Sequence, residues 1–117
     1  MANRALYRLA DMKDSISKIM RLLIDKTYED ILFDEVIRAA YERYLEVLSE
    51  ASKHIPEEWK AEHPKIEWAN IANIGNHLRH AYHKTDYEIL WNIYASQLGA
   101  LEDAVDAMIE TNRKSQT

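Results

Sequence analysis

Residues 68–91 read WANIANIGNHLRHAYHKTDYEILW, and they combine helical spacing with a high density of chemically active side chains. Residues 76–83 alone hold three of the five histidines of the chain, together with an arginine, an asparagine and a tyrosine. Imidazole, guanidinium, amide and phenol groups rarely cluster this closely outside a catalytic or binding site. The segments before and after have the amphipathic pattern of scaffold helices. We therefore predict that this stretch carries the site and that the rest of the chain holds it in place.

The composition indicates a single helical domain. Of 117 residues, 47% are apolar and 30% are charged, while only two are glycine and two are proline. So few turn formers favour long helices. The length suits one domain, residues 1–117, and we expect the polar tail, residues 113–117, to fray. No run approaches the roughly 20 apolar residues of a membrane span, and the charged N-terminus has no signal-peptide core.

The charge and the cysteine count narrow the function. The chain has no cysteine, which excludes disulfides and thiolate metal sites and is compatible with the cytoplasm, where we expect the protein to act. The formal net charge of −5 at pH 7 argues against a general nucleic-acid binder, which would carry a basic stripe. It leaves room for a nuclease whose basic site is small and local.

Apolar spacing and helix-start signals divide the chain into four long helices and a short connector. Thr27 has the hydroxyl that a helix start favours, and the first turn after it, through Phe33, is a candidate separate piece. Pro56 and Pro64 bracket the connecting helix. Residues 84–85 indicate a break before a capping-box pattern. The long helices are predicted at about residues 3–26, 27–54, 67–83 and 86–111, which gives an all-α, up-and-down four-helix bundle.

The chain from His63 to Trp91 resembles the signature region of HepT-type HEPN domains. These are the toxin halves of HEPN/MNT toxin–antitoxin pairs in bacteria and archaea, and their pattern is HPxIxW, a helix, RNxLxHxY, a short gap and D…W. Upstream, AYERYLEVLSEASKHIPEEW resembles the second long helix of the family and the acidic segment after it. The resemblance covers residues 11–105. The matching residues are His63, Pro64, Trp68, Asn76, Leu78, His80, Tyr82, Asp86 and Trp91.

This resemblance implies a helical homodimer that cleaves RNA without a metal or cofactor. In the family, the motif arginine and histidine of both protomers line one cleft. The MNT nucleotidyltransferase antitoxin silences the toxin by transferring AMP to the motif tyrosine. Carried over, the resemblance assigns Asn76 and His80 to the catalytic site and Tyr82 to AMP acceptance. The position of the motif arginine, however, is occupied by Gly75.

The missing arginine matters because metal-free RNA cleavage needs a cation as well as proton transfer. An imidazole can move the protons, since its pKa lies near neutrality. A guanidinium suits the phosphate because it is always charged and presents a planar fork of donors. Arg79 lies four residues after Gly75, one turn along the same helix face. We hypothesise that Arg79 replaces the motif arginine, with His83 or Lys84 as auxiliary cations; the alternative is a weakened toxin.

Each site residue also has a purely structural interpretation. His80 and Tyr82 could be a polar pair at a helix end, where a histidine meets the helix dipole favourably, and Asn76 could be a surface amide. Zinc could use part of the evenly spaced histidine triplet, but no carboxylate stands at a helical step from two of these histidines, so we predict no metal site. Gly75 inside a helix is unfavourable by ~1 kcal/mol relative to alanine, which suggests close approach of another backbone, or drift.

The sequence therefore predicts a HepT-like toxin, a metal-independent endoribonuclease that acts as a homodimer on RNA. His80 would transfer protons, and Arg79 and Asn76 would hold the phosphate. A partner nucleotidyltransferase would neutralise the toxin at Tyr82. The main alternative is a catalytically degenerate helical partner of a nucleotidyltransferase, which Gly75 and the acidic charge favour. A further alternative is a nucleotide-binding protein of a different helical class.

Overall fold

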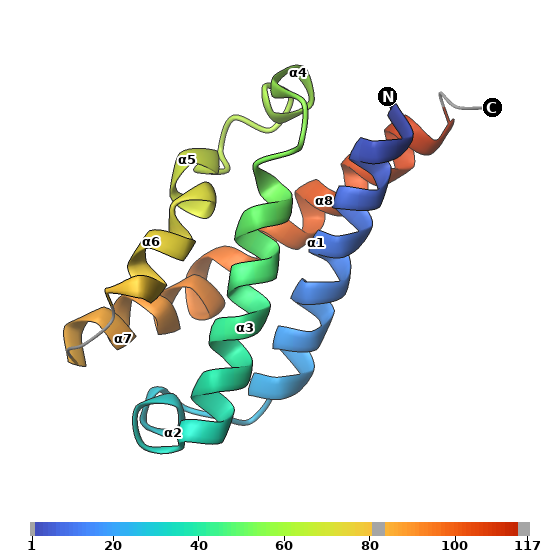
Figure 1. Cartoon of the computed structure of the whole chain (residues 1–117). Coiled ribbons are helices and arrows are strands. Elements are labelled where there is room, and N and C mark those ends of the chain that lie inside the picture. Colours follow the sequence, from blue (N-terminus) through green and yellow to red (C-terminus); the bar gives the residue numbers. More distant parts are fainter. Residues whose placement is uncertain (1, 81–83, 115–117) are drawn as a thin grey trace.

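The computed structural model of the chain describes residues 2–80 and 84–114. Within that part every regular element is a helix and no strand occurs, so the predicted all-α class is confirmed (Figure 1). No helix there is long and apolar enough to cross a membrane. The elements are α1 (Ala2–Leu23), α2 (Tyr28–Phe33), α3 (Glu35–Ser52), α4 (Glu57–Lys60), α5 (Trp68–Ala72), α6 (Ile74–Arg79), α7 (Lys84–Asn92), the π-helix η1 (Ile93–Gln97) and α8 (Leu98–Lys114).

α3 is the central helix, and the other arms pack around it. α1 lies along one side of α3, and the broken arm α5–α6 lies along the other (Figure 1). α7, η1 and α8 follow one another as a continuous helical rod, in which α7 packs on α2 and α8 packs on α1. Successive arms run in alternate directions, and the molecule is elongated, with principal extents of 48 × 24 × 22 Å.

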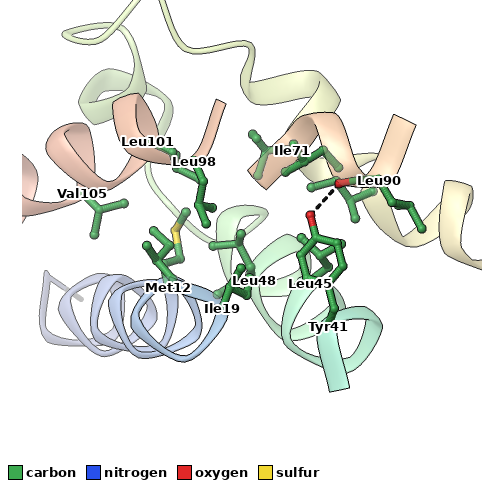
Figure 2. Packing of buried hydrophobic residues seen from close by; sticks show 14 of the residues in the cluster. Met12, Ile19, Tyr41, Leu45, Leu48, Ile71, Leu90, Leu98, Leu101 and Val105 are labelled. Carbon is green, nitrogen blue, oxygen red and sulfur yellow. Dashed lines mark hydrogen bonds between the residues drawn. The ribbon is translucent and has the colours of Figure 1, made fainter. Parts of the chain in front are cut away.

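The core is built from the apolar stripes of these helices. On α1 the fully buried positions recur every three or four residues, at Leu9, Met12, Ile16, Ile19 and Leu23, as the 3.6-residue period requires. Burying an aliphatic side chain of this size stabilises the fold by ~1.5–3 kcal/mol. The other arms contribute Tyr41, Leu45, Leu48, Leu90, Leu98, Leu101 and Val105 to the same cluster (Figure 2).

Two short polar residues, Thr27 and Asp34, mark the starts of α2 and α3. The predicted helix start at Thr27 is confirmed: its N–H donates to Asp30 Oδ2 at 2.7 Å, which satisfies an amide at the exposed helix start. Asp34 ends α2 and starts α3, because its Oδ1 accepts hydrogen bonds at 3.0 and 3.2 Å from the N–H groups two and three residues on. α1 ends at Leu23, before the predicted residue 26, since Asp25 has a left-handed φ of 61°.

The prediction of one continuous helix over residues 67–83 is wrong. The helix is interrupted at Asn73, between α5 and α6, and α6 ends at Arg79. The interruption is stabilised from α3, where the buried Ser49 hydroxyl donates to the Ala72 carbonyl at 3.0 Å. That bond gives the carbonyl a partner that an unbroken helix would otherwise supply.

Of the two connections that flank α5 and α6, the first was predicted correctly and the second was not. Pro56 and Pro64 do bracket the short connecting helix, α4, which lasts one turn. The break predicted at residues 84–85 is wrong, because α7 already begins at Lys84. Helical backbone ends upstream, at His80, whose φ of −122° and ψ of 21° lie outside the α-helical range.

A buried tyrosine hydroxyl stands in the helical rod where α7 gives way to η1. Tyr41 on α3 donates to the Leu90 carbonyl at 2.5 Å (Figure 2). The same hydroxyl accepts a hydrogen bond from the Tyr94 backbone N–H. In a regular α-helix Leu90 and Tyr94 would bond to each other, so the hydroxyl lies between two natural partners. A side chain inserted in this way widens the helical ladder, which accounts for the π-helical turn at residues 93–97.

Candidate active site

α6 carries the predicted catalytic residues toward its C-terminal end. Asn76 and Arg79 stand three residues apart, so they share one face of α6, and His80 follows at its C-terminal end. All three residues are exposed. Tyr82 and His83, the predicted AMP acceptor and auxiliary cation, lie outside the described residues.

Arg79 lies over the glycine that replaces the motif arginine. A Cβ atom placed on Gly75 would stand 3.7 Å from Arg79 Nη1. Helical side chains lean toward the N-terminus of their helix, over the residue one turn earlier. The guanidinium therefore reaches the surface position of residue 75 from one turn further along. Gly75 does not have a positive φ, so its backbone conformation does not require glycine.

Two shallow hollows meet at Gly75 and Arg79. One, of about 450 Å³, extends over α3 toward α1, and the other, of about 630 Å³, lies between α6 and α3. Arg43 and Glu46 of α3 line both hollows and form an ion pair with each other at 2.6 Å. Within the described residues the Arg79 side chain has neither an ion pair nor a hydrogen bond, so its charge is available to a phosphate.

The predicted catalytic imidazole, His80, does not line the hollows that Arg79 lines. Asn76 does not line these hollows either. In the part of the chain that the structure describes, no group of three or more histidine, aspartate or glutamate side chains is arranged to hold a metal ion. One chain thus presents a cation and an imidazole at the exposed C-terminal end of α6, and the two hollows beside Arg79 do not include His80.

α3 adds a carboxyl group that the sequence did not single out. Glu42 lines the same hollow as Arg79. Burial raises the pKa of the Glu42 carboxyl above its usual value, and the cation of Arg38, 3.9 Å away, opposes this only in part. Glu42, Arg43 and Glu46 recur at helical steps along α3. This polar face could be recognised as a wall of the site only once α3 and α6 are known to pack together.

Comparison with known proteins gives the family. Residues 12–108 match the family described as "Ribonuclease HepT-like". The chain belongs to this family. The expected resemblance, over residues 11–105, is thereby confirmed.

Relatives of this HepT-like chain are named as ribonucleases. "Probable ribonuclease HepT" of Thermococcus cleftensis is 34% identical over 94 residues, which are 80% of this chain and 86% of that protein. A "Putative RNase" of Caldanaerobacter subterraneus subsp. tengcongensis is 31% identical over 87 residues, 74% and 78% of the two chains. A "Putative RNase" of Methanocaldococcus jannaschii is 31% identical over 90 residues, 77% and 74%. No solved structure gives a significant match.

The HPxIxW part of the HepT-like signature has a structural role in this chain. The indole N–H of Trp68 donates to the His63 carbonyl at 3.2 Å, and the Lys60 ammonium stands 5.8 Å from the centre of the Trp68 ring. Trp68 and Trp91 are both half-buried and pack against the core. These contacts tie the connector to the start of α5 and so fix the arm that leads to the site.

Proposed function

We propose that this chain is a cytoplasmic endoribonuclease of the HepT type, the toxin of a toxin–antitoxin pair, and that it cleaves RNA without a metal ion. The observation that carries the proposal is the Arg79 guanidinium, 3.7 Å from where a Cβ of Gly75 would stand, in a chain of the ribonuclease HepT-like family. The cation that the family pattern calls for is available at the surface position of residue 75, although the residue there is glycine.

The proposed reaction is a transesterification within the RNA. The ribose 2′-oxygen bonds to the adjacent phosphorus, and its proton passes to a neutral imidazole. The bond from phosphorus to the 5′-oxygen of the next nucleotide breaks as that oxygen takes a proton from an imidazolium. The products are a 2′,3′-cyclic phosphate and a 5′-hydroxyl end. We assign these two proton transfers to His80 of the two protomers of a dimer, since an imidazole exchanges protons near neutral pH.

Arg79 and Asn76 are assigned to the phosphate. The charge on the nonbridging oxygens grows in the pentacoordinate transition state, and a preorganised donor that meets this charge is commonly worth ~3 kcal/mol. The exposed Asn76 amide can donate to a phosphate oxygen. Because Asn76 and Arg79 share one face of α6 and His80 follows at its C-terminal end, a substrate lying along this end of the helix can contact all three.

The test compares wild-type protein with His80→Ala and Arg79→Ala in an RNA cleavage assay that contains EDTA. Wild-type cleavage that leaves 2′,3′-cyclic phosphate ends, and its loss in His80→Ala, are the expected results. His77→Ala is the matched control, since His77 is an exposed histidine of the same helix and should cleave like wild type. Full activity in Arg79→Ala would remove this residue from the mechanism.

We also propose that a nucleotidyltransferase of the MNT type neutralises the toxin at Tyr82. The support is the match of NHLRHAY, residues 76–82, to the family motif. The phenol oxygen would attack the α-phosphorus of ATP and pyrophosphate would leave. The bound AMP, two residues from His80, would then repel RNA and occupy its place. Mass spectrometry after incubation with the partner and ATP should show one added AMP in wild type and none in Tyr82→Phe.

The active form is proposed to be a homodimer. Large apolar side chains are exposed at the end of the molecule where α2 packs on α7: Phe33 is 78% exposed, Val36 79% and Ile89 47% (Figure 1). A second copy that covers this end would remove apolar surface from water. Sedimentation velocity should give a dimer for wild type at micromolar concentration and a monomer for Phe33→Glu/Val36→Glu. A wild-type monomer under these conditions contradicts the two-histidine mechanism.

The second candidate function is a binding partner of a nucleotidyltransferase with no activity of its own. It is favoured by Gly75 at the motif arginine position and by the placement of His80 outside the hollows beside Arg79. The cleavage assay separates the two candidates. Absence of cleavage by wild-type protein that mass spectrometry shows to be free of AMP, together with retained binding of the partner enzyme, would favour the second.

A further inference from the structure

A second basic spot lies beside the N-terminal turns of α1. Arg4, Tyr7 and Arg8 stand at steps of three and four on one face of that helix. With His54, just beyond α3, they line a hollow of about 510 Å³. No acidic residue of the described chain lines it, although the formal net charge of the protein is −5.

The side chains of this hollow suit a nucleotide of a single strand. Tyr7 is 72% exposed, so one ring face is open to a stacking base. Among the described residues neither the Arg4 nor the Arg8 side chain has an ion pair or a hydrogen bond, whereas the His54 ring stands 3.4 Å from a glutamate oxygen. An open aromatic ring between cations that can bind phosphate is the arrangement with which proteins hold single-stranded nucleic acid.

This hollow shares a lining residue with the hollow of the candidate active site. Arg8 lines both it and the 450 Å³ hollow that reaches Gly75 and Arg79. Between the two ends, the cations of Arg43 and Lys53 are already paired with neighbouring glutamates, at 2.6 and 3.3 Å. Attraction for a phosphate backbone is therefore concentrated at the two ends of the path, at Arg79 and at the α1 spot.

The length of the path sets the length of RNA that can use both ends. Arg43, beside Arg79, and His54, beside Tyr7 and just beyond α3, are eleven positions apart, which at 1.5 Å per helical residue is roughly 16 Å along the axis of α3. Because α6 and α1 lie on opposite sides of α3 (Figure 1), the path between the two ends is longer than this. A stacked strand advances about 3.4 Å per nucleotide, so at least about five nucleotides are needed, and a dinucleotide does not cover the distance.

We propose that the hollow of Arg4, Tyr7, Arg8 and His54 is an RNA subsite that holds a nucleotide of the substrate at least about five positions from the bond cleaved at α6. The base stacks on Tyr7, and the two arginines bind the adjoining phosphates. The inference rests on the proposed ribonuclease function and extends it: the substrate is a single strand long enough to cross α3, and the α1 subsite sets where along that strand α6 acts.

Binding is measured with a labelled 12-nucleotide RNA whose 2′-oxygens are all methylated, so that it cannot be cleaved. Fluorescence anisotropy compares wild type with Tyr7→Ala and with Arg4→Gln/Arg8→Gln. We expect each variant to bind about tenfold more weakly, as loss of one stacked base or two phosphate contacts produces. The double variant should also lower the dependence of log K on log salt by about 1.4, or 0.7 for each charge.

The controls separate the subsite from a general loss of charge or fold. Tyr7→Phe keeps the stacking ring and should bind like wild type. Arg21→Gln/Lys26→Gln removes the same charge from the other end of α1, where both side chains are exposed, and should change binding less than threefold. Circular dichroism checks that every variant is folded. A methylated dinucleotide, measured by competition, cannot reach both ends of the path and should bind wild type at least tenfold more weakly than the 12-mer does.

Each outcome decides the proposal. Binding of the 12-mer that is unchanged in both α1 variants, or absent in wild type, overturns it. Wild-type binding that is weakened by the α1 variants, combined with no cleavage of the unmethylated 12-mer, would leave the subsite in place and reject the ribonuclease function. Cleavage of the unmethylated 12-mer by Tyr7→Ala with wild-type kcat/KM would likewise reject the subsite.

Discussion

The Tyr41 hydroxyl offers the sharpest test of how the fold is held together. Tyr41→Phe removes one buried oxygen that now donates to the Leu90 carbonyl at 2.5 Å and accepts from the Tyr94 N–H. The ring itself, which is fully buried, stays and keeps its packing. The substitution therefore isolates the hydrogen bonds from the apolar contacts.

The magnitude follows from the two backbone groups that lose their partner. A buried donor or acceptor without a partner costs about 1–3 kcal/mol. Leu90 and Tyr94 could recover part of this by bonding to each other, if the π-turn at residues 93–97 tightens. We expect the free energy of unfolding to fall by about 2 kcal/mol, which for a domain of this size is a decrease in Tm of about 8 °C.

Urea unfolding followed by circular dichroism measures the change, and the slope against denaturant should stay constant. Tyr44→Phe is the matched control, one turn along α3: Tyr44 is half-buried, and its hydroxyl forms no hydrogen bond with the described residues. It should change stability by less than about 0.5 kcal/mol. An equally small change in Tyr41→Phe would refute the view that this hydroxyl holds α7 and η1 to α3.

Three further outcomes are expected. Burial raises the pKa of the Tyr41 phenol, so the contribution of this group to stability is present below about pH 10, the ordinary tyrosine pKa, and is lost as the pH rises above it. Between pH 8 and 11 the free energy of unfolding, measured with urea, should therefore fall more steeply for wild type than for Tyr41→Phe. Asp34→Ala removes the acceptor that starts α3 and should lower the unfolding free energy by about 1 kcal/mol in the same assay. In RNA cleavage, Arg79→Ala should lower kcat/KM roughly 100-fold, and Gly75→Arg added to it should restore most of the loss, since both side chains reach one surface position; no restoration would contradict this equivalence.

Local signals predicted much of the architecture. The apolar period of α1, the start at Thr27 and the bracketing of α4 by Pro56 and Pro64 all depend on residues within a few positions of one another. The arrangement of Gly75 and Arg79 is local as well, because it follows from the direction of side chains on one helix. Such features can be predicted from the sequence before any tertiary contact is known.

The interruption between α5 and α6 and the π-turn, which were not predicted, share a different origin. The π-turn depends on Tyr41, which stands 49 residues before its partner Leu90. The interruption between α5 and α6 is stabilised by Ser49 of α3, 23 residues before the Ala72 carbonyl. In both places a side chain from α3 supplies the hydrogen bond that a regular helix would make within itself. Glu42 was missed for the same reason, since its role as a wall of the hollow exists only once α3 and α6 pack together.

The clearance above Gly75 also bears on the history of this site. The 3.7 Å from a Cβ of Gly75 to Arg79 Nη1 is an ordinary van der Waals distance, so a Cβ at residue 75 and the arginine at residue 79 can coexist. With arginine at both positions, one guanidinium would have to turn away from the shared surface position, which exposed arginine side chains can do. Gain of the second arginine followed by loss of the first would move the cation by one helical turn in sequence and hardly at all in space. At no step in that lineage would the phosphate lack a guanidinium.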